Sequence, residues 1–200
     1  ASEVMKKIRE ISHQPIQFLI NTHYHGDHTS GNSIIGKGAW IISQINCQNS
    51  LMRRLKPEES AESMGIPQIT YVKEMCFQFD SEPIRLEWHG SAHTSGDTIV
   101  IFEKSKVIHT GDLFFNGSAA YIDVKDGSQT RNWISIIRKI SQKYPDFTII
   151  PGHGPVSNMK EWLEFADYLQ FLRDQVIAAI KAGKTREQAM ETINLEKYKH

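Results

Sequence analysis

The chain has 200 residues, and the 40% of them that are hydrophobic are enough to bury the core of one domain. Its 23 Lys and Arg residues balance its 23 Asp and Glu residues, so no net charge favours a nucleic acid as partner. No apolar run approaches the roughly 18 residues of a membrane span, and two distant cysteines indicate no disulfide framework.

The first elements expected along the chain are a helix and a buried strand. Val4, Ile8 and Ile11 give the opening helix one apolar face. The short apolar run 16–20, Ile-Gln-Phe-Leu-Ile, is typical of a buried strand. The strand ends just before Thr22-His23-Tyr24-His25-Gly26-Asp27-His28, so this run is expected at a strand end.

Four residues of this run have side chains that bind metal ions, namely His23, His25, Asp27 and His28. His23 and His25 follow a strand, and on near-extended backbone both side chains leave on the same side. Gly26 then allows a sharp turn that directs Asp27 and His28 towards a neighbouring point. One pair is therefore expected to serve one metal ion and the other pair a second ion close by.

Short strands and turns are expected through the middle of the chain. The strand 39–42 precedes a helix that carries Ile45, Leu51, Met52 and Leu55 and ends by Pro57. The stretch 57–67, rich in Glu and Ser, is expected to be a loop or a short exposed helix. Further strands are expected at 69–72, 76–79, 84–88, 98–102 and 106–109. Because turns separate these strands, they are expected to form an antiparallel sheet.

Helices dominate the last third of the chain. One helical face is formed by Trp133, Ile136, Ile137, Ile140 and Tyr144, and Pro145 closes that helix. A buried strand is expected at 147–150. Two helices are expected after this strand. One covers 158–182, with a capping box of Asn158 and Glu161 and a core stripe along Trp162. The other covers 185–194 and is capped by Thr185 and Gln188.

Three more ligand-type residues follow expected strands or turns. They are His93 in Ser91-Ala92-His93-Thr94-Ser95-Gly96-Asp97, Asp112 in Thr110-Gly111-Asp112, and His153 in Pro151-Gly152-His153-Gly154. With the first run they make five histidines and two aspartates, enough for two metal ions with an exchangeable position left open. The ligands are expected on loops at strand ends, held by a rigid scaffold.

In this order the motifs resemble the metallo-β-lactamase superfamily, from about Pro15 to Pro155 and the following helix. The resemblance implies an α/β (α+β) fold, a four-layer αββα sandwich with the metals in a groove between the sheets, as one domain over 1–200. It also implies two Zn²⁺ per chain, with Fe or Mn as alternatives. The implied ligands are His23, His25 and His93 for the first metal, Asp27, His28 and His153 for the second, and Asp112 as bridge, as in the hydroxyacylglutathione hydrolase type of site.

Two departures from the family narrow what the resemblance implies. The β-lactamases with a zinc-binding cysteine carry Cys where this chain has Asp112, with an Arg-like residue in place of His28, and another lactamase subclass lacks the bridging Asp. Family members also usually open with several strands that complete the first sheet. This chain starts in the helix that follows them, so a truncated or processed form is expected, or another segment supplies those strands.

The activity expected at such a site is hydrolysis by a metal-bound hydroxide. Two divalent cations carry four positive charges against two from Asp27 and Asp112, the expected catalytic carboxylates, and the remaining field favours hydroxide. A metal ion would also polarise a carbonyl group. We therefore expect cleavage of an ester, thioester or amide/lactam bond of a small-molecule substrate, and the Asp112 bridge places esters and thioesters ahead of β-lactams.

Three alternatives stay open beside this expectation. One is a β-lactamase-like enzyme that hydrolyses β-lactam antibiotics, and another is a persulfide dioxygenase-like oxidoreductase with a single iron. The third is a metal-binding or scaffolding protein without turnover. A diiron electron-transfer member is disfavoured, because it would carry Glu at the position of His25.

Few residues outside the ligand set have an expected role. Tyr121, in the segment 116–123, is a candidate for a substrate contact, because loops beside ligands often touch substrate. Asp97 is expected to support a ligand or to brace its turn. The remaining histidines are expected to pack or to face solvent: His13, His89, His109 and His200. No basic cluster for a phosphate or for glutathione carboxylates is evident.

The compartment and the oligomeric state stay open. The sequence fits a soluble protein of the cytoplasm, or of the periplasm if a signal peptide precedes it.

Overall fold

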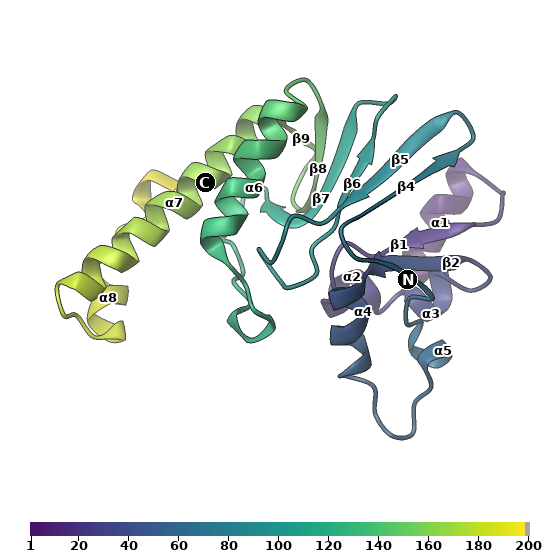
Figure 1. Cartoon of the computed structure of the whole chain (residues 1–200), viewed down its shortest axis with the longest axis horizontal. Helices are drawn as coiled ribbons and strands as arrows, with labels where there is room; N and C mark the ends of the chain where they lie inside the picture. The colour runs from purple at the N-terminus through teal and green to yellow at the C-terminus, as the bar shows by residue number, and fades with distance from the viewer. Residues whose placement is uncertain (199–200) are drawn as a thin grey trace.

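The computed structural model describes residues 1–198, so His200 lies outside the described part of the chain. Two β-sheets pack face to face, and helices lie outside both of them (Figure 1). This arrangement confirms the predicted αββα fold class. Within residues 1–198, no helix is long and apolar enough to cross a membrane.

The smaller sheet has three parallel strands in the order β1 (Phe18–Ile20), β2 (Trp40–Gln44) and β3 (Ile69–Tyr71). Its connections contain α2 (Gly26–Thr29), α3 (Asn32–Ile35), α4 (Ile45–Met52) and α5 (Ala61–Met64). The strand expected at 69–72 therefore does not belong to the antiparallel sheet, and that prediction was wrong. The crossover through α4 and α5 brings the chain back in the same direction, which makes β3 parallel to β2.

The larger sheet has six strands in sequence order, and its first four strands are antiparallel as predicted. Its strands are β4 (Glu74–Phe79), β5 (Glu82–Glu87), β6 (Ile99–Phe102), β7 (Val107–Phe115), β8 (Thr148–His153) and β9 (Ser157–Asn158). β7 is longer than the predicted strand 106–109, because Thr110-Gly111-Asp112 stays in the sheet and leads into the buried residues 113–115. Asp112 consequently projects from a strand and not from a loop.

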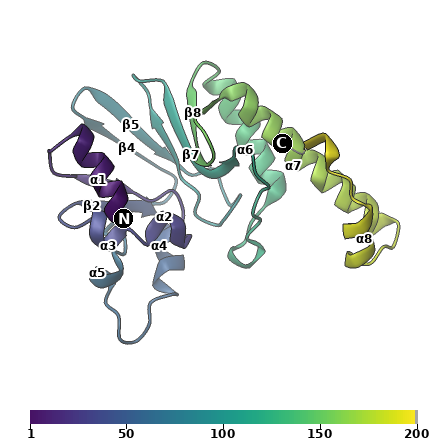
Figure 2. The same cartoon turned by 180° about the vertical axis from the view of Figure 1, so that it is seen from behind.

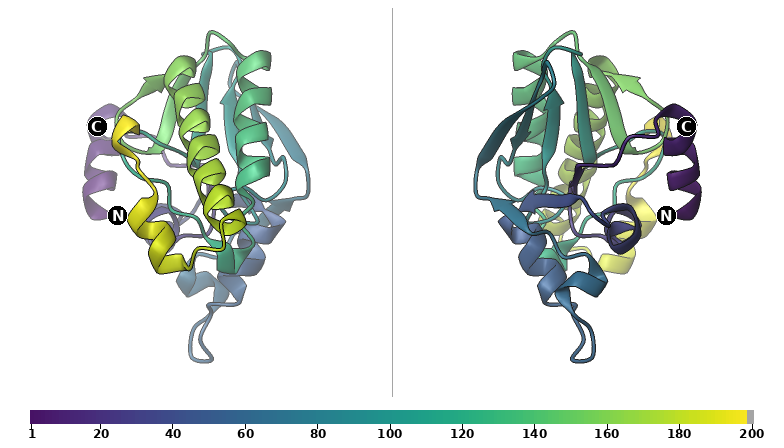
Figure 3. Two further views of the ribbon diagram at one scale, coloured as in Figure 1. Left: turned by 90° about the vertical axis from the view of Figure 1, so that its left-hand side faces the viewer. Right: turned by 90° about the vertical axis from the view of Figure 1, so that its right-hand side faces the viewer.

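Two apolar layers hold these elements together. Ile42 and Tyr71 of the small sheet pack with Leu86 and Val100 of the large sheet, which fills the space between the sheets. On the outer face of the large sheet, α6 (Thr130–Lys143) and α7 (Met159–Lys181) lie side by side (Figure 3). Their buried side chains form one core with β6, β7 and β8.

Two tryptophans connect this outer core to the strand segment that carries Asp112. The indole N–H groups of Trp133 in α6 and Trp162 in α7 both donate to the carbonyl oxygen of Leu113, each at 3.0 Å. Both side chains are fully buried. Because Leu113 directly follows Asp112, the helices fix the backbone from which that carboxylate projects.

The carboxy-terminal helices are capped in two ways. Thr185 and Gln188 form the predicted capping box at the start of α8 (Arg186–Thr192). At the start of α7, the Asn158 side chain accepts from the backbone N–H of Glu161 at 3.1 Å. The predicted second half of that box is absent, because the Glu161 carboxylate accepts from the Ser157 hydroxyl instead.

The first helix and α8 lie at opposite ends of the molecule, and after α8 the described chain turns back so that Tyr198 packs against Tyr168 and Phe171 of α7 (Figure 2). At one end, α1 (Ser2–Ile11) forms as predicted, but its apolar face stays at the surface, with Val4 50% and Ile11 88% exposed. At the other end, α7 runs past the sheet, so Val176 is 39% exposed although Trp162 is buried. Two short 3-10 helices complete the structure, η1 (Val124–Asp126) and η2 (Glu196–Tyr198).

Candidate metal centre

The seven predicted ligand residues converge at one edge of the two sheets. They arrive from five places in the chain: the segment after β1, the start of α2, the β5–β6 loop, the middle of β7 and the end of β8. They form two groups in which the potential ligand atoms all lie within 4.8 Å of one another. The first group is His23, His25, His93 and Asp112, and the second is Asp27, His28 and His153.

In the first group, three imidazole nitrogens point at one small volume. Nδ1 of His25 lies 3.1 Å from Nε2 of His23 and 3.0 Å from Nε2 of His93. Oδ2 of Asp112 closes this volume, at 3.5 Å from His23 and 3.4 Å from His93. Three nitrogens and one carboxylate oxygen at these separations match the ligand number and type of a tetrahedral zinc site.

The second group has the same character and is more open. Nε2 of His28 and Nε2 of His153 each lie 3.3 Å from Oδ2 of Asp27. Asp112 also reaches this group, with Oδ1 at 3.1 Å from His28 and Oδ2 at 3.3 Å from His153. Asp112 is thus in contact with both groups at once.

Two buried atoms test whether a cation fits here. Nε2 of His28 and Oδ1 of Asp112 are buried, and neither has a hydrogen-bond partner within residues 1–198. The two atoms are 3.1 Å apart, but their alignment does not make a hydrogen bond. Buried polar atoms without partners are costly, and one cation placed between them would satisfy both. The imidazole and carboxylate donors suit zinc, so the residues fit divalent metal ions.

In the first group, the protonation states of two histidines also favour metal binding. Burial, reinforced by the neighbouring histidines, holds the pKa of His23 well below its ordinary value. Burial also lowers the pKa of His93 to about 4, against the opposing charge of Asp112. Both rings are therefore neutral at pH 7, the form that binds metals. For Asp112, burial opposes ionisation, but contact with His28 outweighs it and lowers the pKa of the carboxyl.

The ring nitrogens that face away from the first group have partners of their own. Nε2 of His25 lies 2.9 Å from Oδ2 of Asp123, and Nδ1 of His93 lies 2.8 Å from the carbonyl oxygen of Tyr121. The Tyr24 hydroxyl donates to the same Asp123 oxygen. A partner on the outer nitrogen fixes the orientation of the ring and leaves the inner nitrogen to the metal.

Asp123 and Tyr24 were not predicted as site residues. Tyr121 of the segment 116–123 was expected to contact substrate, but nothing in the sequence indicated that the last residue of this segment meets His25, 98 positions away. The contact depends on the path of the loop after β7, and no local pattern reports it.

Two glycines allow the strands to approach this closely. A Cβ atom on Gly152 would lie 2.0 Å from Oδ1 of Asp112, so β8 can pass beside that carboxylate only without a side chain. Gly111 has a φ angle of +52°, and a Cβ atom there would lie 2.6 Å from Thr22. The glycines that flank the ligands in the sequence thus have a steric reason.

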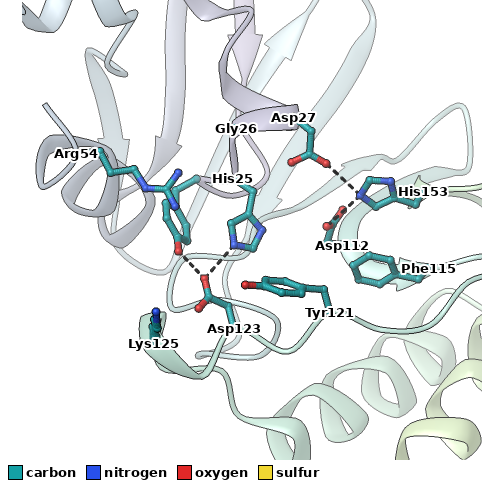
Figure 4. Close-up of a pocket in the computed structure, with 11 residues that line it drawn as sticks. His25, Gly26, Asp27, Arg54, Asp112, Phe115, Tyr121, Asp123, Lys125 and His153 are labelled. Atoms are coloured by element: carbon teal, nitrogen blue, oxygen red, sulfur yellow. Dashed lines mark hydrogen bonds and ion pairs between the residues drawn. The ribbon is translucent and has the colours of Figure 1, made fainter.

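A cavity of about 540 Å³ opens beside the ligands (Figure 4). Asp27, Asp112 and His153 lie on one side of it, and His25 lies nearer the centre. Tyr121 lines it, 59% exposed, with its ring centroid 5.5 Å from that of His25. The remaining lining residues include the aromatic side chains of Tyr24 and Phe115 and two cations, Arg54 and Lys125.

Three further residues considered in the sequence analysis, Asp97, His89 and His109, lie outside the cavity. Both carboxylate oxygens of Asp97 accept from Thr94, and the Thr94 hydroxyl is 2.7 Å away, so Asp97 braces the turn after His93. His89 pairs with Glu87 at 2.7 Å, and His109 accepts from the backbone N–H of Gly111 at 3.0 Å. Among the residues 1–198, these side chains do not belong to either ligand group.

Comparison with known proteins agrees with this site. A family model described as the metallo-beta-lactamase superfamily matches residues 2–153. The hydroxyacylglutathione hydrolase GloC of Haemophilus influenzae is 26% identical over 162 residues, which cover 77% of this chain and 76% of that protein. A probable metallo-hydrolase of Methanocaldococcus jannaschii is 26% identical over 172 residues, 78% of each chain.

Solved structures share the fold. A metallo-beta-lactamase from Pontibacter korlensis superposes with a TM-score of 0.70 over 84% of this chain and 76% of its own, at 20% sequence identity. At that identity the likeness establishes the fold alone.

Proposed function

The chain belongs to the metallo-beta-lactamase superfamily, and its relatives are named as hydrolases. From this premise we propose that it is a dinuclear zinc hydrolase acting on an ester or thioester of a small molecule. The observation that carries the proposal is the position of Asp112. Its carboxylate touches four histidines, two from each ligand group, at 3.1 to 3.5 Å. A carboxylate between two ligand groups offsets the repulsion between two cations, which favours two ions over one.

Water is the nucleophile in this proposal, because among the described residues the cavity offers no serine or cysteine side chain for covalent catalysis. Of the described residues that line it, none is Ser or Cys. Cys47 is buried away from the cavity, and burial raises its pKa to about 12, while Cys76 lies on β4. A pair of zinc ions would supply charge to activate water and to polarise the carbonyl group.

The chain itself would position the reactants and handle the proton. Asp27 lines the cavity with its side chain 57% exposed, so we assign to it the proton released when water adds to the carbonyl carbon. Phe115 stacks on His153, with ring centroids 5.1 Å apart and an angle of 12°, and gives this end of the cavity an apolar wall. Tyr121 lines the cavity beside His25.

The relatives support a thioester among the substrates. GloC is named a hydroxyacylglutathione hydrolase, and its match covers 77% of this chain. A relative from Elizabethkingia meningoseptica is named a metallo-beta-lactamase, at 23% identity over 67% of this chain. We rank β-lactam hydrolysis second because of the Asp112 bridge. We rank a single-iron oxygenase third, because Asp27, His28 and His153 offer ligands for a second ion.

A hydrolysis screen on zinc-loaded protein tests the proposal. The panel contains activated esters, thioesters, lactones, penicillins and carbapenems, with Asp112→Asn as the inactive reference and Glu58→Gln as a surface control. We expect thioester or ester hydrolysis well above the rate of Asp112→Asn. Equal rates for the two proteins on every substrate would refute the proposal.

A further inference from the structure

We propose that Arg54 and Lys125 form a subsite for a negatively charged group of the substrate, so that the enzyme acts on anionic esters or thioesters. This inference rests on the hydrolase function proposed above and adds the substrate class to it. No basic cluster is visible in the sequence, because the two residues are far apart in the chain. The fold brings both to the rim of one cavity.

The cavity has two ends of different character. Figure 4 shows Arg54 and Lys125 at one end and Asp27, Asp112 and His153 at the other, with Tyr121 between them. A substrate that places its carbonyl group at the ligand end therefore extends its other end towards the two cations. A carboxylate there would gain charge-assisted hydrogen bonds from both side chains.

Neither cation has an acidic partner within residues 1–198. Arg54 lies instead over the ring of Tyr24, 4.2 Å from the guanidinium carbon to the ring centroid. Stacking on an aromatic face leaves the N–H groups in the guanidinium plane free to donate to a ligand. The neighbouring Arg53 differs, because it is paired with Asp126 at 3.0 Å.

That neighbouring ion pair also holds the two cations in place. Asp126 accepts from Arg53 and Ser50 through one oxygen and from Ser95 through the other, at 2.8 to 3.0 Å. Arg54 follows Arg53 and Lys125 precedes Asp126 in the chain. The Arg53–Asp126 ion pair therefore connects the end of α4 to η1. Arg54 lies next to this pair in one segment and Lys125 in the other, and neither has an acidic partner among the described residues.

The acidic residue nearest to this subsite is already engaged. Oδ2 of Asp123 accepts from Tyr24 and His25, and its Oδ1 accepts from the backbone N–H of Asp126 at 3.2 Å. The other carboxylates of the cavity, Asp27 and Asp112, belong to the ligand groups. The charge of Arg54 and Lys125 is therefore available to a ligand.

Matched substrates that differ only in charge test the subsite. The probes are 3-(acetylthio)propanoate and 5-(acetylthio)pentanoate, each compared with its primary amide on the zinc-loaded protein. We expect kcat/KM to favour the carboxylates by about tenfold, mostly through KM, and the preference to shrink with added salt because both cations are exposed. The double variant Arg54→Gln/Lys125→Gln should bring the ratio close to one.

A second double variant controls for net charge. Lys37→Gln/Lys56→Gln removes two exposed cations that do not line the cavity, and it should keep the tenfold preference. Wild-type protein that hydrolyses carboxylates and amides equally well would overturn the subsite and leave the hydrolase function standing. A preference that survives in the Arg54→Gln/Lys125→Gln variant would also overturn it, because the anion would then bind elsewhere.

Calorimetric binding separates the subsite from catalysis. The non-hydrolysable thioether 3-(propylthio)propanoate should bind more tightly than its amide, and the Arg54→Gln/Lys125→Gln variant should lose that difference. If no thioester is hydrolysed but this difference holds, the proposed reaction fails and the anion subsite stands. Equal binding of the thioether and its amide by wild-type protein would refute the subsite whatever the enzyme hydrolyses.

Discussion

Nε2 of His25 lies 2.9 Å from Oδ2 of Asp123, and this contact turns Nδ1 of His25 towards His23 and His93. His25 therefore differs from its two partners, which present Nε2 to the same point. Asp123 is itself held by the Tyr24 hydroxyl, so the orientation of His25 depends on a loop about a hundred residues further along the chain.

The first prediction is that Asp123→Ala weakens the metal site without removing a ligand. A lost partner on the outer nitrogen of a metal-binding histidine commonly costs about 10- to 100-fold in metal affinity. Zinc affinity, measured by competition with a chromophoric chelator, should fall by that order in Asp123→Ala. Asp123→Asn keeps an acceptor oxygen and should lose less, and Tyr24→Phe less still. Unchanged affinity in Asp123→Ala would show that the His25 orientation does not depend on this contact.

The seven ligand-type residues were predictable because their signal is local. His23, His25, Asp27 and His28 share six positions, and glycines flank the remaining ligands. Asp123, Arg54 and Lys125 were missed for the opposite reason, since each reaches the cavity through contacts between distant segments. The type of a side chain is visible in the sequence, whereas the path of a loop is set by the whole fold.

The same distinction separates the correct and incorrect predictions about the fold. The strands and helices with strong hydrophobic periodicity, such as α6 with its buried Trp133, appear where expected. The sheet to which β3 belongs was predicted wrongly, because hydrophobic pattern locates a strand but does not name its neighbour. The exposed apolar face of α1 likewise shows that amphipathicity predicts a helix and not what covers it.

The second prediction concerns metal stoichiometry. With two ligand groups in place, protein reconstituted with zinc should hold close to two ions per chain by elemental analysis. His153→Ala removes a ligand from the more exposed group and should lower the count towards one. A count of one or less in fully reconstituted wild-type protein would contradict the dinuclear site and move the single-iron alternative forward.

The third prediction concerns Asp112. Because its carboxylate contacts both groups, Asp112→Asn should lower the occupancy of both ions and reduce hydrolysis by orders of magnitude. His28→Ala, which removes a ligand from one group only, is the comparison and should mainly affect one ion. Retention of two ions and full activity by Asp112→Asn would exclude a bridging role.

The fourth prediction concerns the pH dependence of folding. Glu87 is 5% exposed and contacts His89 at 2.7 Å and Lys143 at 3.1 Å. Burial opposes its ionisation, but these two partners outweigh it and lower its pKa from 4.5 to about 2. A carboxyl with a lower pKa in the folded state stabilises the protein above its unfolded-state pKa. The contribution, roughly 2–3 kcal/mol, is then lost as the pH falls from about 4.5 to about 2.

Urea unfolding of metal-free protein measures this contribution. At pH 7, Glu87→Gln should lower the free energy of unfolding, and the gap to wild-type protein should narrow steadily below pH 4.5. Glu58→Gln, at an exposed position, is the matched control and should track wild-type protein throughout. A gap between Glu87→Gln and wild-type protein that stays constant from pH 7 to pH 3 would assign the loss to packing and not to charge.

The fifth prediction concerns the nucleophile and the scissile bond. If water attacks the carbonyl group directly, no covalent acyl-enzyme forms, because no Ser or Cys of the described chain lines the cavity. A chelator should abolish turnover reversibly, whereas serine-directed and thiol-directed reagents should leave it largely intact. Activated thioesters should be cleaved well above β-lactams. Mass spectrometry of protein quenched during turnover should show only the unmodified mass, and a trapped acyl adduct would overturn the mechanism.

Penicillin or carbapenem cleavage well above that of thioesters would reverse the ranking of substrates, because the walls formed by Phe115 and Tyr121 would then accept the bicyclic ring better than an open chain.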